Sequence, residues 1–184
     1  MSKFNVPTRE EVSTSNQAIF DQLKGKLGFV PNLYAAFAHS ENALSTFLTL
    51  SGSKTSFTNK EKEVIDLAIS NVNDCGYCQA AHTAIAKMNG FDEPQTIELR
   101  QGRASWDSKL DALAKISRSL AENRGRVSEN LKENFFNAGY TKENLVDLVV
   151  ASGAINITNT LHNLTNVEID FPLAPTLELS LIHI

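Results

Sequence analysis

The sequence predicts an all-α protein, and three observations support this fold class. Capping signals for helices recur along the chain, apolar residues follow them at spacings of three and four positions, and strand signals are nearly absent. The 184 residues are 42% hydrophobic and 21% charged, as in ordinary globular proteins. A chain of this length buries roughly 70% of its unfolded surface, so it forms a core without metal ions or disulfides. We therefore expect a single helical domain over residues 1–184.

The N-terminal part of this domain, residues 1–56, is expected to contain three helices. The T-R-E-E stretch that begins at Thr8 is a capping box and predicts a helix over residues 8–24. Pro31 suits the first turn of a short second helix, and Ser40 can cap a third.

The central part, residues 57–102, contains the clearest helix signal. A second capping box, T-N-K-E from Thr58, predicts a helix over residues 59–71 with one apolar face directed to the core. Asp74 is a good cap for the next helix, over residues 75–89, and a shorter helix completes this part.

The third part, residues 103–170, is expected to form a long helix up to Gly125, a short helix over residues 128–138 and a last long helix over residues 141–161. Five residues of the last helix recur at helical spacing and are expected to face inward: Leu145, Leu148, Val149, Ser152 and Ile155. Prolines exclude a helix from the extended tail, residues 171–184, where alternating leucines leave a short strand and a disordered end both open.

The second and third parts share an internal echo. An aromatic residue, a threonine and a helix with an apolar-apolar-Asp-Leu run occur from Phe57 and again from Tyr140. In the second copy Asn156 and Asn159 fall where the cysteines of the first copy stand. Either two related helical units pack within one domain, and the first alone kept a reactive centre, or two amphipathic helices look alike by chance.

Composition and charge exclude some classes of function. The formal net charge is −4 and no basic run interleaved with aromatics occurs, so the chain does not suit a nucleic-acid backbone. The N-terminal residues lack the apolar stretch of a signal peptide, and no window reaches the roughly 18 apolar residues of a membrane span. We therefore expect a cytoplasmic protein that binds neither nucleic acid nor membrane. Lasting structural disulfides are rare in the cytoplasm, so the two cysteines of the single C-x-x-C indicate chemistry or metal binding.

The candidate reactive centre is this C-x-x-C segment, which opens a predicted helix. Amides and partial positive charge at a helix N-terminus stabilise a thiolate, which is the form that attacks a peroxide or a disulfide. Cys75 and Cys78 are one turn apart and can close on one another as a disulfide. His82 follows Cys78 by four positions, so its imidazole can take the thiol proton or stabilise the thiolate. The helix end favours Cys75 as the more acidic thiol, whereas His82 favours Cys78.

Glu63 is the candidate proton relay. It precedes Cys75 by twelve positions, and antiparallel packing of the two helices brings such a residue toward the thiols. Zinc binding by Cys75, Cys78 and His82 is the main alternative, although a structural zinc site takes four ligands, and inert buried thiols are another. The remaining histidines have no partner pattern and are interpreted as structural or solvated: His39, His162 and His183.

The pattern of these residues resembles the core motif of the AhpD-like alkylhydroperoxidases, which belong to the carboxymuconolactone decarboxylase superfamily. Glu63, the C-x-Y-C segment containing Tyr77, and His82 stand at the spacings of that motif, and the closing N-V-E-I-D-F-P stretch also looks like this group. The sharp similarity covers about residues 57–102, and a looser one covers most of the chain. The resemblance implies an AhpD-like helical bundle and a homo-oligomer, commonly a trimer or a hexamer.

The resemblance also implies a thiol peroxidase that needs no bound cofactor. In that family the second cysteine, here Cys78, attacks the hydroperoxide substrate, and the first, here Cys75, resolves the product to a disulfide. His82 then assists the nucleophile, and Glu63 joins a relay through water. Tyr77 stands where the best studied members carry a second histidine; a phenol is a poor base at neutral pH but can orient a water or peroxide oxygen. The implied reductant is a thioredoxin-like or lipoyl-bearing dithiol protein.

Two other functions remain open at this point. The superfamily also contains decarboxylases and lactone-processing enzymes, but those members generally lack the cysteine pair. A non-enzymatic redox sensor or stress-response protein would use the same disulfide as a switch, and turnover with a regenerating dithiol distinguishes it from a peroxidase.

Overall fold

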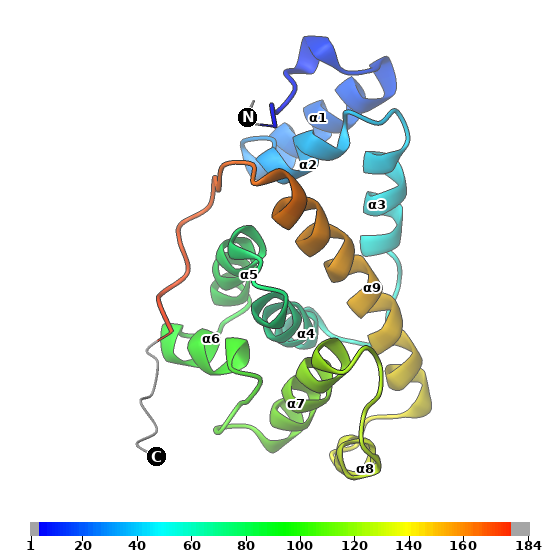
Figure 1. Cartoon of the computed structure of the whole chain (residues 1–184), viewed down its shortest axis with the longest axis vertical. Helices are drawn as coiled ribbons and strands as arrows, with labels where there is room; N and C mark the ends of the chain where they lie inside the picture. Colours follow the sequence, from blue (N-terminus) through cyan, green and yellow to red (C-terminus); the bar gives the residue numbers. More distant parts are fainter. Residues whose placement is uncertain (1–3, 178–184) are drawn as a thin grey trace.

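A computed structural model describes residues 4–177, and within that range the chain is all-helical, with no strand (Figure 1). The all-α prediction is confirmed. The α-helices are α1 (Thr14–Leu27), α2 (Asn32–Phe37), α3 (Ala43–Ser51), α4 (Asn59–Val72), α5 (Gly76–Met88), α6 (Glu93–Arg100), α7 (Ser108–Glu122), α8 (Glu129–Asn137) and α9 (Lys142–Thr165).

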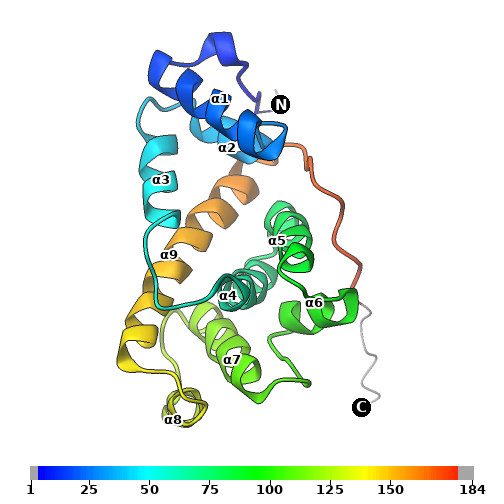
Figure 2. The ribbon, with the colours of Figure 1, turned by 180° about the vertical axis from the view of Figure 1, so that it is seen from behind.

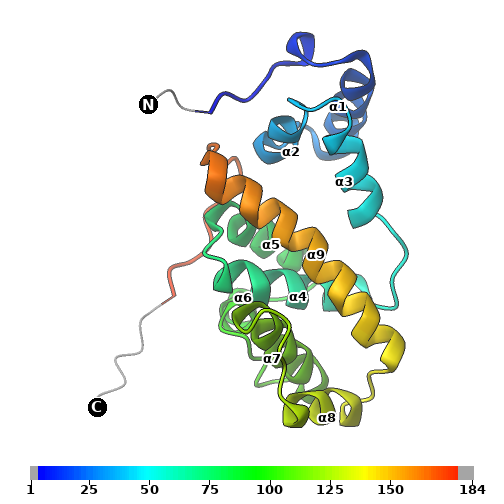
Figure 3. The ribbon, with the colours of Figure 1, turned by 45° about the vertical axis from the view of Figure 1, so that its right-hand side comes forward.

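Helix α4 lies at the centre of the larger group of helices. It packs against α5, α6, α7 and α9, and α8 packs on α7 (Figure 2). The N-terminal helices α1, α2 and α3 lie on the other side of α9, which α2 and α3 contact (Figure 3). The buried side chains form two clusters, one mainly within each group, and Leu33 and Ala36 of α2 belong to the cluster of the larger group.

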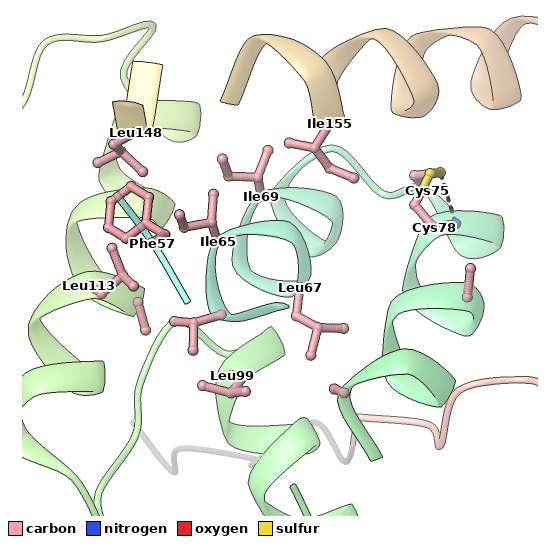
Figure 4. Close-up of a cluster of buried hydrophobic side chains, with 14 of the residues drawn as sticks. Phe57, Ile65, Leu67, Ile69, Cys75, Cys78, Leu99, Leu113, Leu148 and Ile155 are labelled. Atoms are coloured by element: carbon pink, nitrogen blue, oxygen red, sulfur yellow. Dashed lines mark hydrogen bonds between the residues drawn. A yellow bond between two sulfur atoms is a disulfide. The ribbon is translucent and has the colours of Figure 1, made fainter. Parts of the chain in front are cut away.

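Burial of α4 is more complete than one apolar face predicts. Its fully buried apolar side chains are Val64, Ile65, Leu67, Ala68 and Ile69. Figure 4 shows α4 surrounded by Leu99 of α6, Leu113 of α7 and Ile155 of α9. Each fully buried Leu, Ile or Val contributes roughly 1.5–3 kcal/mol relative to exposure. This packing on several sides fixes the helix that carries the acidic residues of the candidate site.

The N-terminus differs from the sequence prediction. The capping box at Thr8 caps the start of a short 3-10 helix, η1 (Arg9–Glu11), and not of the α-helix predicted over residues 8–24. Val12 is extended and buried, so the chain changes direction there. Helix α1 begins after a second cap, Ser13, and ends at Gly28, whose left-handed φ of 84° favours glycine.

The inward-facing residues predicted for α9 are correct except for one. Leu148, Ser152 and Ile155 are buried and Leu145 is half-buried against the core, but Val149 is 60% exposed, so its prediction is wrong. The buried residues recur every three or four positions along an uninterrupted helix, and Val149 lies about 100° around the helix from Leu148, at the edge of the buried face next to the exposed Val150.

The two helices of the internal echo are α4 and α9. Both helices of the echo begin with capping boxes, but Asn156 and Asn159 lie in the middle of α9, where they accept hydrogen bonds from Asn73 at 2.6 and 2.8 Å. The relation of the two units stays a prediction.

Residues 171–177 have no regular secondary structure, and the rest of the predicted tail lies outside the described residues. No described helix is both long enough and apolar enough to cross a membrane.

Candidate active site

The C-x-x-C segment lies where α4 turns into α5. Asp74 reverses the chain in the left-handed region, with a φ of 50°. Ser70 of α4 accepts a hydrogen bond from Gln79 of α5, and the earlier residue Glu63 contacts the later residue His82. The two helices are therefore antiparallel, which is the packing that brings Glu63 against His82 in the middle of α5.

Cys75, and not Asp74, caps helix α5. Its Sγ atom accepts the backbone N–H of Cys78 at 3.2 Å, and the two cysteines form a disulfide with their Cα atoms 5.4 Å apart (Figure 4). Both are buried, at 0% and 2% exposure. An amide directed at sulfur from a helix N-terminus stabilises negative charge on that sulfur. Once the disulfide is reduced, this contact favours a thiolate at Cys75.

His82 lies between two carboxylates of α4. Its Nδ1 atom is 2.9 Å from Oε2 of Glu63 and 3.4 Å from Oδ2 of Asp66. Glu63 and Asp66 are one helical turn apart, so both face α5. The three side chains are only 9–20% exposed, and this shielding strengthens the interaction between their charges.

The cluster holds a protonated imidazole. Burial opposes the charge on His82, but the carboxylates of Asp66 and Glu63 outweigh burial and raise its pKa to about 9. Burial raises the pKa of Asp66 to about 6, against the opposing effect of His82 and with a further increase from Glu63. At neutral pH His82 is therefore an imidazolium, which donates a proton and stabilises nearby negative charge but does not act as a base.

The residues that could bind a metal ion are not the set Cys75, Cys78 and His82 that the sequence suggested for zinc. Within residues 4–177, the potential ligand atoms that lie within 4.8 Å of one another belong to Glu63, Asp66 and His82, and neither cysteine joins them. The cysteines are bonded to each other instead. A metal ion at the three-residue cluster would first have to displace the proton that the two carboxylates hold on His82.

Tyr77 is directed at the segment that follows α9. Its hydroxyl donates to Oδ1 of Asp170 at 2.6 Å and accepts the backbone N–H of Leu33 at 3.3 Å. Asp170 also accepts the N–H of Asn32 at 2.8 Å. Burial and then the bond to Asp170 raise the pKa of Tyr77, so the phenol stays protonated. Tyr77 therefore ties the start of α5 to α2 and to the C-terminal segment.

A pocket of about 660 Å³ opens beside these residues, between the N-terminal helices and α4, α5 and α9. Four of the five residues predicted for the site line it: Glu63, Tyr77, Cys78 and His82. Cys75 does not line it. Of the two cysteines, Cys78 is therefore the one on the pocket side.

Two residues of this arrangement were missed by the sequence analysis. Asp66 follows Glu63 by three positions and occurs in the echo motif, so helical spacing alone was a signal that it faces α5. Asp170 is 93 positions from Tyr77 in the chain, and no local pattern predicts their hydrogen bond.

The fold and the site together define a class: an all-helical protein with a disulfide-forming C-x-x-C beside a histidine–carboxylate cluster. Residues 31–118 match the model of the carboxymuconolactone decarboxylase family. This similarity covers just under half of the chain, from the start of α2 into α7. No curated protein sequence matches the chain.

Solved structures share the fold at low sequence identity. An uncharacterized peroxidase-related protein with an alkylhydroperoxidase AhpD core, from Ralstonia eutropha JMP134, aligns with a TM-score of 0.82 and 22% identity over 92% of each chain. An uncharacterized peroxidase-related protein from Silicibacter sp. TM1040 aligns with a TM-score of 0.78 and 22% identity over 89% of each chain. A cysteine-to-alanine variant of the debrominase Bmp8, in complex with 2,3,4-tribromopyrrole, aligns with a TM-score of 0.77 and 12% identity over 92% of each chain. At these identities the similarity establishes the AhpD-like fold.

Proposed function

We propose that this chain is a thiol-dependent peroxidase that reduces hydroperoxides through Cys75 and Cys78. The observation that carries the proposal is the position of Cys78, which lines the pocket together with His82, whereas Cys75 does not. A nucleophile must meet the peroxide, but a resolving cysteine needs to meet only the nucleophile. The disulfide between the two is the product expected of such a cycle.

The proposed reaction has two steps. The Cys78 thiolate attacks the terminal oxygen of R–O–O–H, the O–O bond breaks, and the His82 imidazolium gives a proton to the leaving alkoxide, which departs as R–OH. Cys75 then attacks the resulting sulfenic acid, hydroxide leaves and is protonated to water, and the disulfide forms. One hydroperoxide is thereby reduced to alcohol and water while two thiols are oxidised.

The carboxylates support this role for the histidine. Glu63 and Asp66 hold the proton on Nδ1, so Nε2 is the nitrogen left to exchange a proton with a ligand in the pocket. Tyr77 is assigned a positioning role through Asp170, since its hydroxyl is already engaged there. An imidazolium also favours the thiolate of Cys78, one helical turn away, by its charge.

The similarity to the carboxymuconolactone decarboxylase family suggests the partners. An external dithiol protein, thioredoxin-like or lipoyl-bearing, would restore the thiols by exchange. A homo-oligomer, a trimer or a hexamer, is consistent with the apolar residues that α9 exposes: Val146, Val149, Val150, Ile157 and Leu164. An exposed apolar stripe of this kind marks a surface that another protein covers.

Two alternatives have less support. A decarboxylase or lactone-processing activity does not need a disulfide-forming pair of cysteines, one of which lines the pocket. A redox sensor would form the same disulfide but would not turn over, and a regenerating dithiol tests that difference.

The experiment is to follow consumption of tert-butyl hydroperoxide in the presence of excess dithiothreitol. Replacement of Cys78 by serine should abolish turnover. Cys75→Ser should permit one rapid oxidation and then lose activity, because no second thiol resolves the sulfenic acid. Full turnover in either variant would refute the proposal, and oxidation without turnover in the unaltered chain would favour the sensor.

A further inference from the structure

The pocket beside Cys78 is much larger than a small peroxide needs. Its volume of about 660 Å³ lies in the range of roughly 300–1,000 Å³ that is typical of sites for drug-sized ligands. Hydrogen peroxide has two heavy atoms and no surface to place against apolar walls. The size of the pocket therefore indicates a substrate with a substantial organic group.

The walls of the pocket are mostly apolar. Helices from both groups of the fold contribute side chains such as Leu33, Phe47, Ile85 and Ile155. At the rim, side chains that line the pocket also face solvent, among them Leu27 at 50%, Phe29 at 37% and Met88 at 87% exposure. Exposed apolar residues that continue into a pocket favour a ligand with a long apolar part.

Three lysines line the same pocket: Lys26 on α1, Lys54 in the α3–α4 loop and Lys62 on α4. Within residues 4–177, none of the three lies within 4.0 Å of a carboxylate oxygen. Lys62 instead donates to the carbonyl oxygen of Ser51, at the end of α3 and near Lys54 in the chain. Lysines from three elements therefore line the pocket, and in the described part of the chain none has a carboxylate oxygen within 4.0 Å, although Lys62 lies close enough to Asp66 and His82 to lower their pKa values.

The carboxylates that line the pocket are occupied elsewhere. Glu63 and Asp66 hold His82. Asp147 accepts hydrogen bonds from the backbone N–H of Ser56 at 2.6 Å and from the hydroxyl of Thr55 at 3.2 Å. An incoming anion would therefore meet ammonium groups that are available for pairing.

We infer that the pocket takes an amphipathic hydroperoxide, with a long apolar chain against the pocket walls and a carboxylate paired with Lys54 and Lys62. This inference rests on the proposed function, because it places the peroxide oxygens at Cys78. It names the substrate class as the hydroperoxide of a long-chain carboxylic acid.

Oxidation of the reduced full-length chain by three peroxides tests this inference: a long-chain unsaturated fatty-acid hydroperoxide, its methyl ester and hydrogen peroxide. Thiol loss should be fastest with the free acid, by at least about fivefold over the ester, and this preference should shrink as salt is added. The double variant K54Q/K62Q should reduce the acid-to-ester ratio to about one. The ratio isolates the charge effect, because both substrates react at the same sulfur.

The matched control is K115Q/K132Q, which removes two lysines from α7 and α8, outside the pocket. It should keep the acid-to-ester ratio of the unaltered chain. Equal rates for acid and ester, or a preference for hydrogen peroxide, would overturn the inference and leave the peroxidase proposal standing.

Oleate carries no peroxide and cannot react, so its binding tests the ligand class separately from the peroxidase proposal. The disulfide form should bind oleate at least about fivefold more tightly than methyl oleate by displacement of a fluorescent fatty acid, and K54Q/K62Q should lose that difference. Oleate binding without oxidation by any peroxide would refute the peroxidase proposal and keep the ligand class. No preference for oleate would refute the ligand class.

Discussion

Replacement of Asp66 by asparagine gives the sharpest test of the cluster around His82. The change removes a carboxylate 3.4 Å from Nδ1 but retains the size of the side chain and leaves the closer Glu63 in place. The pKa of His82 stands at about 9 instead of its usual 6.5 because two carboxylates together overcome burial. Loss of one of them should lower that pKa by about 1–2 units, equivalent to about 1.4–3 kcal/mol.

An NMR titration of the His82 ring protons measures this pKa directly. Asp147→Asn is the matched control, because Asp147 lines the same pocket but pairs with Ser56 and not with His82. The control should leave the pKa of His82 near 9. A pKa near 6.5 in the unaltered chain, or the same value with and without Asp66, would refute the reasoning.

Three further predictions concern stability. The folded state raises the pKa of His82 from 6.5 to about 9, so its contribution to stability is complete below pH 6.5 and is lost as the pH rises through 9. The free energy of unfolding in urea should decrease by at most about 3.4 kcal/mol over this range, and the decrease should be absent in His82→Asn. Tyr77→Phe removes the hydrogen bond to Asp170 and should lower the free energy of unfolding by about 1.5–3 kcal/mol. The double variant with Asp170→Asn should lose less stability than the sum of the two single variants, and a loss equal to that sum would show that the two residues do not interact. Leu67→Ala at the centre of α4 should cost about 2–5 kcal/mol by thermal unfolding, whereas the exposed Leu164→Ala should cost under about 1 kcal/mol.

The helices near the site could be predicted from local signals. The capping box at Thr58, the apolar spacing after it and the break before Cys75 fixed α4 and the start of α5, and all three act within a few residues. The N-terminal helix was placed too early because the same motif at Thr8 closes only a 3-10 turn, and burial of Val12 is a tertiary effect.

The candidate site was predictable to the extent that it lies on one helical hairpin. Glu63 and His82 meet because antiparallel packing follows from the short turn at Asp74. The link from Tyr77 to Asp170 and the pocket between two groups of helices depend on contacts between distant parts of the chain. No spacing rule reports such contacts, and the same holds for the protonated state of His82, which depends on burial and on Asp66 together.

The central claim is that Cys78 attacks the peroxide and Cys75 resolves the product. The most direct measurement is mass spectrometry of the Cys75→Ser variant, treated with one equivalent of tert-butyl hydroperoxide and a sulfenic-acid trap, with Cys78→Ser treated in parallel. The account predicts a rapid trap adduct on Cys78 in the first variant and little reaction at Cys75 in the second. An adduct on Cys75 and an unmodified Cys78 would contradict it.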